Sequence, residues 1–578
     1  MMNKLLISLS IVVLLLFSEK MNAQQQTFCN PMNLNYRFWS SSREAADPAM
    51  IMYKGNYLLF ASRSGGYWYS VDMLDWKYVR TETLPILKYA PGVIAINDTV
   101  YYLASSRMKD YIYYSTNPFE DNWKKMDRKL PMDVWDPQFF QDDDGKVYLY
   151  WGCSNKDSEP IRVVELNDKM QPKTVPIVCI RHNPDRHGWE VFGANNETDE
   201  NGFNEGAWMN KHEEKYYLQY ASNGTEFKTY ADGVYTSDSP TGPFEYETYS
   251  PFSYKPGGFI GGTGHSSTFQ DRYGNYWHVT SLSIASRSQF ERRLGLFPAS
   301  FDKDGVLRTY TAFGDYPMMM PSGKMKPNQE NLFAGWMLLS YNKKASVSSS
   351  LEQYPVTNAF DENVKTWWSA KTGNKGEWLS VELDDKVTAI EAIQINFADH
   401  EALLNPGDTN TYAYLIWASN DGNKWEVVVD RSNNTIDACH DYIELKEPIK
   451  AKYIKIENVK DVPGDGKFSV FDFRIFGTQK GKKPNRVNEF SVTRDSTDPR
   501  KATVKWHNDK SATGYVINYG TDANKLYTSV MVYDLDSVEL TGLNVGVTYY
   551  FSIDAFNETG ITKATKRSLL NDKTNQNQ

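Results

Sequence analysis

The stretch Gly202-Phe203-Asn204-Glu205-Gly206-Ala207-Trp208-Met209, followed by Asn210-Lys211-His212-Glu213-Glu214 and Lys215-Tyr216-Tyr217-Leu218-Gln219-Tyr220-Ala221, decides the fold of this chain. It contains a carboxylate ahead of an apolar run, a polar turn and a second run rich in aromatic residues. Aromatic residues favour strands, so the pattern predicts two strands joined by the turn. The same layout recurs in the first 300 residues with different residues at the leading position.

Five units with this layout run from Asp47 to about Asp315, and most of them add a third short strand. The leading positions 47, 91, 136, 205 and 265 lie 44, 45, 69 and 60 residues apart. Repeats of about 40 to 50 residues with several short strands each are typical of β-propellers. Because one unit cannot bury its own faces, we expect the five to pack radially. The sequence therefore predicts an all-β chain that begins with a five-bladed β-propeller.

The leading residues of the innermost strands converge at one mouth of a propeller's central funnel. We therefore expect Asp47, Asp136, Glu205 and His265 to meet in space. Taken singly, each has a structural explanation: Asp-Pro pairs favour turns, a glutamate can be a solvated loop residue, and a histidine can pack with a satisfied ring. Three carboxylates near one axis repel one another, however, and such a group is costly unless a site uses it.

Length and composition leave several classes open and exclude one. A chain of 578 residues predicts three or four domains at about 150 residues each. Aromatic residues make up 14% of the chain, which is common in proteins that handle carbohydrates and is equally explained by an all-β fold. The net charge of −9, without any basic block, argues against nucleic acid as a partner.

The first 23 residues have the three parts of a signal peptide: Lys4, the apolar run from Leu5 to Phe17, and a small-residue exit at Ala23. The apolar run is too short to span a bilayer stably, so no transmembrane segment is expected. Cys29 follows a poor match to a bacterial lipobox. We therefore expect an exported protein, periplasmic or extracellular.

The four cysteines, Cys29, Cys153, Cys179 and Cys439, are too scattered to form a disulfide framework. An oxidising compartment would allow a disulfide between Cys153 and Cys179, and buried free thiols are the alternative.

The phrases Ala46-Asp47-Pro48-Ala49, Trp135-Asp136-Pro137 and Asn204-Glu205-Gly206-Ala207 resemble those of glycoside hydrolase family 43. Gly264-His265 and Arg292-Arg293-Leu294-Gly295 extend the resemblance over roughly residues 27 to 320. It implies an inverting exo-glycosidase that acts on plant-type polysaccharide or oligosaccharide side chains, first of all an α-L-arabinofuranosidase or a β-xylosidase. A member acting on β-galactosides and a non-catalytic carbohydrate-binding propeller are the alternatives.

The resemblance also implies roles for the three acids. Asp47 would be the general base that activates water, and Glu205 the general acid that protonates the departing glycosidic oxygen. Asp136 would raise the pKa of Glu205 by like-charge proximity and hold its orientation. Inverting glycosidases keep the acid and the base about 6.5–9.5 Å apart to leave room for the water.

Further residues are implied to bind substrate or metal. Either Arg292 or Arg293 would contact a sugar hydroxyl or the acids, and three tryptophans are candidates for stacking on a sugar ring, with core packing as the alternative role for at least one of them. These tryptophans are Trp68, Trp135 and Trp208. No cofactor is expected to be required; a structural calcium, reached by His265 through water, is implied only weakly because calcium prefers oxygen ligands. The polar insertion of residues 182–204 is expected to form a rim loop that sets specificity.

Two further β domains are expected after the propeller domain of residues 27–325. Residues 333–478 resemble a discoidin-like (factor V/VIII type C) jelly roll, which would be a sugar binder or a spacer. Residues 486–574 resemble a fibronectin type III sandwich and are expected to act as a spacer. The predicted partner of the whole chain is a carbohydrate substrate.

Overall fold

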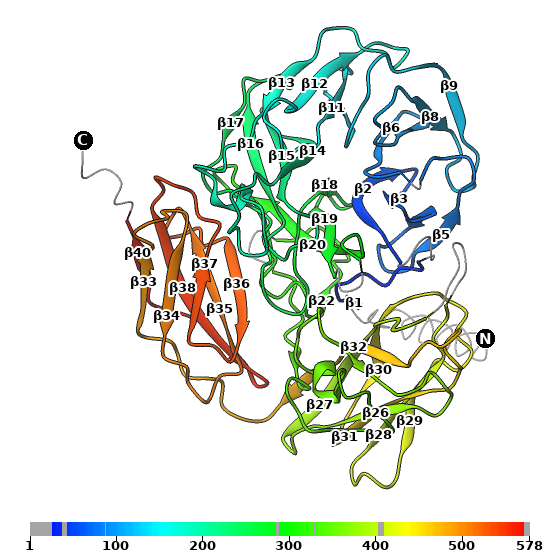
Figure 1. Cartoon of the computed structure of the whole chain (residues 1–578), viewed down its shortest axis with the longest axis vertical. Coiled ribbons are helices and arrows are strands. Elements are labelled where there is room, and N and C mark those ends of the chain that lie inside the picture. The colour runs from blue at the N-terminus through cyan, green and yellow to red at the C-terminus, as the bar shows by residue number, and fades with distance from the viewer. Residues whose placement is uncertain are drawn as a thin grey trace, which may run out of the picture.

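A computed structural model describes residues 26–36, 43–86, 88–284, 288–326, 331–402 and 410–571. The predicted signal peptide, residues 1–23, lies outside them. Over the described ranges the regular elements are strands, apart from the short 3₁₀ helices η1 (Gly188–Glu190) and η2 (Val356–Ala359) (Figure 1). None of the helices in these ranges has the length and apolar character needed to cross a membrane.

The expected five-bladed propeller is confirmed, with five four-stranded sheets whose strands follow one another from the inner to the outer edge. The ring closes because each inner strand contacts the inner strands of both neighbouring blades (Figure 1). The blades are β2 (Ala46–Tyr53), β3 (Asn56–Ser62), β4 (Gly66–Ser70), β5 (Lys77–Arg80); β6 (Gly92–Ile96), β7 (Thr99–Leu103), β8 (Tyr111–Ser115), β9 (Lys124–Lys129); β10 (Gln138–Gln141), β11 (Val147–Trp151), β12 (Ile161–Leu166), β13 (Ile177–Ile180); β14 (Phe203–His212), β15 (Lys215–Asn223), β16 (Ala231–Ser237), β17 (Glu245–Tyr246); and β18 (Ser266–Gln270), β19 (Tyr276–Ser283), β20 (Arg292–Phe301), β21 (Leu307–Thr309).

The fourth strand of each blade was not predicted. Strand β9 shows why, because it reads Lys-Lys-Met-Asp-Arg-Lys and is mostly exposed. An outer edge strand with no sheet beyond it carries charge, which discourages pairing with another chain. The apolar alternation that identifies inner strands is therefore absent from it.

A left-handed residue stands at the start of each inner strand. The φ angles are 52° at Asp47, 41° at Ala90, 48° at Asp136, 62° at Gly206 and 49° at His265. In the first and fourth blades the ladder is interrupted at this residue by a bulge. The predicted leading positions 91 and 205 are therefore each one residue off, since the equivalent residues are Ala90 and Gly206.

Side chains of the preceding blade hold the non-glycine left-handed residues in place. The backbone N–H of each non-glycine residue of the set donates a hydrogen bond to such a side chain: Asp47 to Ser281 (2.8 Å), Ala90 to Ser62 (2.6 Å), Asp136 to Ser105 (3.1 Å) and His265 to Asp232 (3.0 Å). Left-handed conformations cost a non-glycine residue about 1–3 kcal/mol and persist only where the surroundings fix them. The contact between blades provides that fixation.

Two β-sandwiches follow the propeller. The first, here called the jelly-roll domain, packs the sheet β23-β32-β27-β30, joined by β25, on the sheet β24-β26-β31-β28-β29. Its strands are β23 (Met337–Leu338), β24 (Ala345–Val347), β25 (Trp368–Ser369), β26 (Trp378–Glu382), β27 (Val387–Phe397), β28 (Tyr414–Ser419), β29 (Glu426–Asp430), β30 (His440–Ile449), β31 (Tyr453–Asn458) and β32 (Ser469–Gln479).

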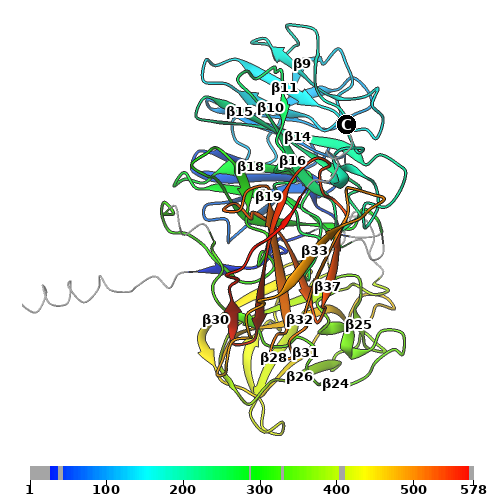
Figure 2. The ribbon, with the colours of Figure 1, turned by 90° about the vertical axis from the view of Figure 1, so that its left-hand side faces the viewer.

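The second, here called the C-terminal sandwich, packs β33-β34-β37 on β36-β35-β38-β39, joined by β40. Its strands are β33 (Phe490–Arg494), β34 (Ala502–Trp506), β35 (Gly514–Gly520), β36 (Thr528–Tyr533), β37 (Ser537–Leu540), β38 (Tyr549–Asn557), β39 (Gly560–Thr562) and β40 (Ser568–Leu570). Its assignment as a fibronectin type III domain stays a prediction. Figure 2 shows it beside both the propeller and the jelly-roll domain.

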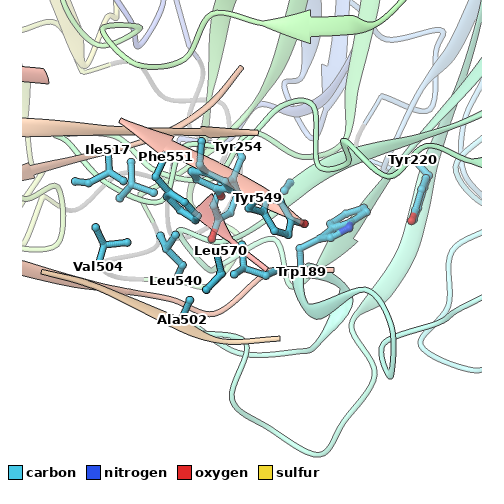
Figure 3. Close-up of a cluster of buried hydrophobic side chains, with 14 of the residues drawn as sticks. Trp189, Tyr220, Tyr254, Ala502, Val504, Ile517, Leu540, Tyr549, Phe551 and Leu570 are labelled. Carbon is cyan, nitrogen blue, oxygen red and sulfur yellow. The ribbon is translucent and has the colours of Figure 1, made fainter. Parts of the chain in front are cut away.

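The C-terminal sandwich shares a hydrophobic core with the fourth blade. Trp189 and Tyr254 pack in one buried cluster with Leu540, Tyr549 and Phe551 (Figure 3). The backbone N–H of Gly188 also donates to the carbonyl of Leu543 at 3.1 Å. The domain is therefore fixed to the propeller and is not a loosely tethered spacer.

A buried arginine joins the jelly-roll domain to the propeller. Arg474, on β32, pairs with Glu362 through Nε at 2.7 Å and Nη2 at 2.8 Å. Its Nη1 donates to the carbonyl oxygen of Asp315, which follows the fifth blade. Burial raises the pKa of Glu362 and of its neighbour Asp472, so removal of the guanidinium would leave these carboxyls unpaired in the interior.

We predict that Arg474→Leu destabilises the protein by about 3–5 kcal/mol because it leaves buried acids without a cation. The measurement is the thermal unfolding midpoint by calorimetry. Arg431→Ala is the control, since Arg431 pairs with Asp441 at 3.2 Å while 42% of its side chain is exposed. Equal midpoints for both variants would contradict the anchoring role of Arg474.

Candidate active site

A cavity of about 750 Å³ opens at the propeller mouth. The four residues predicted to meet, Asp47, Asp136, Glu205 and His265, all line it. They come from four different blades: Asp47 lies on β2, Asp136 just ahead of β10, Glu205 on β14 and His265 directly ahead of β18.

Asp47 is held as a carboxylate. Its Oδ1 accepts a hydrogen bond from Nη1 of Arg292 at 3.0 Å, and its Oδ2 accepts one from the hydroxyl of Ser62 at 2.5 Å. Burial raises the pKa of Asp47, but Arg292, His265 and the hydroxyls of Ser62 and Ser281 outweigh it and leave the pKa below its usual value. This carboxylate is therefore ionised at neutral pH and can accept a proton.

The two carboxylate oxygens of Glu205 have different hydrogen-bond donors. The hydroxyl of Tyr230 donates to Oε1, and the thiol of Cys153 lies 3.0 Å from Oε2. Burial, followed by the negative charge of Glu205, raises the pKa of Tyr230 well above its usual value, so the phenol remains a donor. Glu205 is thus fixed from both sides at the edge of the cavity.

Asp136 is the acid that retains a proton most readily. Burial raises its pKa to about 7, opposed by His265 and assisted by the nearby carboxylates of Glu205 and Asp47. Its Oδ1 accepts a hydrogen bond from the hydroxyl of Ser105 at 3.2 Å. A carboxylate oxygen of Asp136 and one of Glu205 lie within 4.8 Å of each other, so the two negative charges repel.

His265 stands between two of the acids. Its Nδ1 lies 3.5 Å from Oδ1 of Asp47 and 3.7 Å from Oδ2 of Asp136. Burial lowers the pKa of His265, but the surrounding carboxylates raise it more, so the net shift is upward. Because Nδ1 of His265 points at two carboxylates and calcium prefers oxygen ligands, this nitrogen does not fit a calcium ion.

Over the described ranges, one group brings three potential ligand atoms within 4.8 Å of one another: Asp136, Cys153 and Glu205. A thiol is a poor ligand for calcium, which prefers oxygen. This group does not fit calcium either.

Some of the predicted substrate-binding residues line the cavity and others lie outside it. Trp135 lines the cavity, where the guanidinium of Arg107 sits 4.4 Å from its ring centre, and Arg292 lines it beside Asp47. Trp68 is fully buried and donates its indole N–H to the carbonyl of Asn35 at 3.0 Å.

Trp208 and Arg293 are also outside the cavity lining. The indole N–H of Trp208 donates to the carbonyl of Thr268 at 2.9 Å, and its ring packs on a core between blades. Arg293 is buried against the jelly-roll domain, with Nε 3.0 Å from Sγ of Cys439. Trp68 and Trp208 thus have the core-packing role that was their alternative, and of the two arginines Arg292 lines the cavity while Arg293 does not, because side chains alternate across a strand.

The cysteines are free thiols. Cys153 faces Glu205, and Cys179 lies on the outer strand β13. The alternative of a Cys153–Cys179 disulfide is thus not realised.

Sequence reasoning missed other cavity residues. Tyr230 and Cys153 touch Glu205 from positions outside the repeated leading place, and their polarity gave no periodic signal. Phe192 and Phe203 line the cavity wall, and both lie within the insertion predicted as a rim loop. Phe290 lines it as well, before β20.

Comparison with known proteins supports a glycoside hydrolase. Residues 41–307 match the family model described as glycosyl hydrolases family 43, and residues 344–471 match the F5/8 type C domain, which agrees with the expected discoidin-like domain. A β-xylosidase of Xylanibacter ruminicola is 27% identical over 193 residues, covering 30% of this chain and 57% of that protein.

An arabinoxylan arabinofuranohydrolase of Paenibacillus polymyxa is 30% identical over 155 residues, covering 25% of this chain and 22% of that protein. The match thus spans less than two thirds of the length of either relative. A crystal structure of a thermostable family-43 glycoside hydrolase, 24% identical, aligns with a TM-score of 0.41 over 52% of this chain and 98% of the other.

We predict that Gly206→Ala lowers turnover at this site by an order of magnitude or more. A Cβ at position 206 would stand 2.7 Å from Cγ of His265, so the ring must move. Gly145→Ala is the matched control, since Gly145 also has a positive φ, 84°, with nothing within 4 Å of an added Cβ. Both variants should lose about 1 kcal/mol of stability from backbone strain, but only Gly206→Ala should lose turnover. Equal turnover in the two variants would contradict this prediction.

Proposed function

We propose that this protein is an inverting exo-glycosidase. One observation carries the proposal: Asp47, a carboxylate whose partners keep it ionised, shares a cavity with Glu205 and with Asp136, whose pKa is raised to about 7. Separating a base from an acid in this way is what glycoside hydrolysis requires. The family match over residues 41–307 supports the same reaction class.

In the proposed mechanism, Asp47 removes a proton from a water molecule while that water's oxygen forms a bond to the anomeric carbon. The bond between this carbon and the glycosidic oxygen breaks, and its electron pair remains on the departing oxygen. Glu205 gives its proton to that oxygen, so Asp47 ends protonated and Glu205 ionised. Exchange with solvent restores both, and attack opposite the leaving group inverts the anomeric centre.

The remaining residues position the two groups. Arg292 holds Asp47 ionised and bridges it to Glu44, whose Oε1 lies 2.8 Å from Nη2. Asp136 acts on Glu205 through like charge: a proton on the pair relieves their repulsion, so the pair keeps one near neutral pH. His265 offsets part of the negative charge between Asp47 and Asp136.

The proposed substrate is a plant-type saccharide with a terminal α-L-arabinofuranosyl or β-xylosyl group. The names of the two relatives support these sugars. Trp135, Phe203 and Phe290 give the cavity aromatic surface of the kind that suits the C–H face of a sugar. We further propose that the protein is exported, on the pattern of residues 1–23.

A non-catalytic sugar-binding propeller is the second candidate, and a family member acting on β-galactosides is the third. Release of p-nitrophenol from α-L-arabinofuranoside, β-xyloside and β-galactoside conjugates separates them. Hydrolysis of none of the three, together with saccharide binding, would favour the binding protein.

We predict that Glu205→Gln and Asp47→Asn each abolish hydrolysis while the chain remains folded. The losses should reach at least about 100-fold, because each removes one proton-transfer partner. The assay is release of p-nitrophenol, with circular dichroism as the control for folding. NMR of the first-formed product should show the inverted anomer. Near-normal turnover in either variant, or a retained anomer, would refute the assigned roles.

We predict a pH profile of kcat/KM that falls on the alkaline side near pH 7. The pKa of Asp136, raised to about 7, means that the pair with Glu205 loses its proton as the pH rises through this value. In Asp136→Asn the like charge beside Glu205 is gone, so the alkaline limb should move to lower pH. An unmoved limb would show that Asp136 does not control the proton on Glu205.

A further inference from the structure

Cys153 contacts the proposed general acid directly, although nothing in the proposed reaction assigns it a role. It follows the inner half of the third blade, just after β11, and its Sγ lies 3.0 Å from Oε2 of Glu205. Sγ and a carboxylate oxygen from each of Glu205 and Asp136 all lie within 4.8 Å of one another. The thiol thus lies close to both acids.

The thiol is a weak donor and not a nucleophile in this environment. Burial, and then the negative charges of Asp136 and Glu205, raise the pKa of Cys153 well above its usual value. Since the thiolate is the reactive form of cysteine, the group stays protonated and unreactive at neutral pH. A thiol S–H donates more weakly than a hydroxyl.

Glu205 therefore has one strong and one weak hydrogen-bond donor. Tyr230 donates its hydroxyl to Oε1, which fixes that oxygen as an acceptor. At Oε2 the thiol stabilises the carboxylate only slightly, so protonation of this oxygen costs only a weak hydrogen bond. The asymmetry distinguishes the two oxygens of one carboxyl group.

We propose that Cys153 is a positioning residue for proton transfer, which keeps Oε2 of Glu205 as the oxygen that carries the proton to the departing glycosidic oxygen. This inference rests on the proposed glycosidase function. After transfer, Oε2 is left ionised and accepts the hydrogen bond from the thiol. This hydrogen bond is therefore strongest in the ionised state of Glu205.

Other ionisable groups face the same space, and the test must separate their effects from that of Cys153. From the blades and loops packed around Glu205 they are Asp47, Lys88, Tyr89, Arg107, Asp136, Glu226, Tyr230, His265 and Arg292. A change confined to position 153 leaves all of them in place, so a shift of the pH profile can be assigned to the donor at Oε2.

The test compares Cys153→Ser with Cys153→Ala in the full chain. A hydroxyl donates more strongly and should stabilise ionised Glu205, moving the alkaline limb of the kcat profile down by about half a pH unit. Alanine removes the donor and should move the limb up by a similar amount, with kcat severalfold lower because Glu205 loses a contact. The substrates are p-nitrophenyl α-L-arabinofuranoside and p-nitrophenyl β-xyloside, and kcat is measured from about pH 5 to about pH 9.

Cys179→Ser is the matched control, since Cys179 is partly buried on the outer strand β13 and does not line the cavity. Its profile should equal that of the unchanged protein. Opposite shifts in the two Cys153 variants support the inference, because a purely structural role would lower activity without moving the limb in two directions. Shifts of the same sign, or none, overturn it. Failure of the unchanged protein to hydrolyse any glycoside would instead overturn the proposed function.

Discussion

This site depends on one interaction: the backbone N–H of a left-handed residue donates a hydrogen bond to a side chain of the preceding blade. Three of these residues, Asp47, Asp136 and His265, carry ionisable side chains that line the cavity. Ser62 and Ser105 each accept a hydrogen bond from the backbone N–H of a left-handed residue and also donate one to a carboxylate oxygen. The hydrogen bonds between neighbouring blades therefore also determine where these acids lie.

The fourth blade departs from this pattern, and the departure is functional. Gly206 takes the left-handed position there, which moves the carboxylate of Glu205 one residue earlier than in the other blades. A side chain at 206 would collide with His265, so the glycine lets the fourth and fifth blades approach closely. Glu205 consequently meets Tyr230 and Cys153 and not a serine of the preceding blade.

The repeat could be read from sequence because its inner strands combine apolar alternation with a polar start. The outer strands could not, since an exposed edge such as β9 has no apolar period. The convergence of the four leading residues followed from propeller geometry alone. The aromatic contacts did not: Trp68 and Trp135 both lie in aromatic-rich stretches, and only three-dimensional packing shows that the first is core and the second lines the cavity. Cys153 and Tyr230 carry no sequence pattern that marks them as partners of Glu205.

Both additional domains pack against segments of the propeller that line the cavity. Arg292 and Arg293 are neighbours on β20 and point to opposite sides: the first binds Asp47, and the second is buried against Cys439 of the jelly-roll domain. Likewise the insertion of residues 182–204 places Trp189 in the core of the C-terminal sandwich and Phe192 in the cavity wall. Since side chains alternate across a strand, any shift of β20 that served one arginine would displace the other. The domains that sequence suggested as spacers thus fix the position of the cation that keeps Asp47 ionised and of the wall facing Glu205.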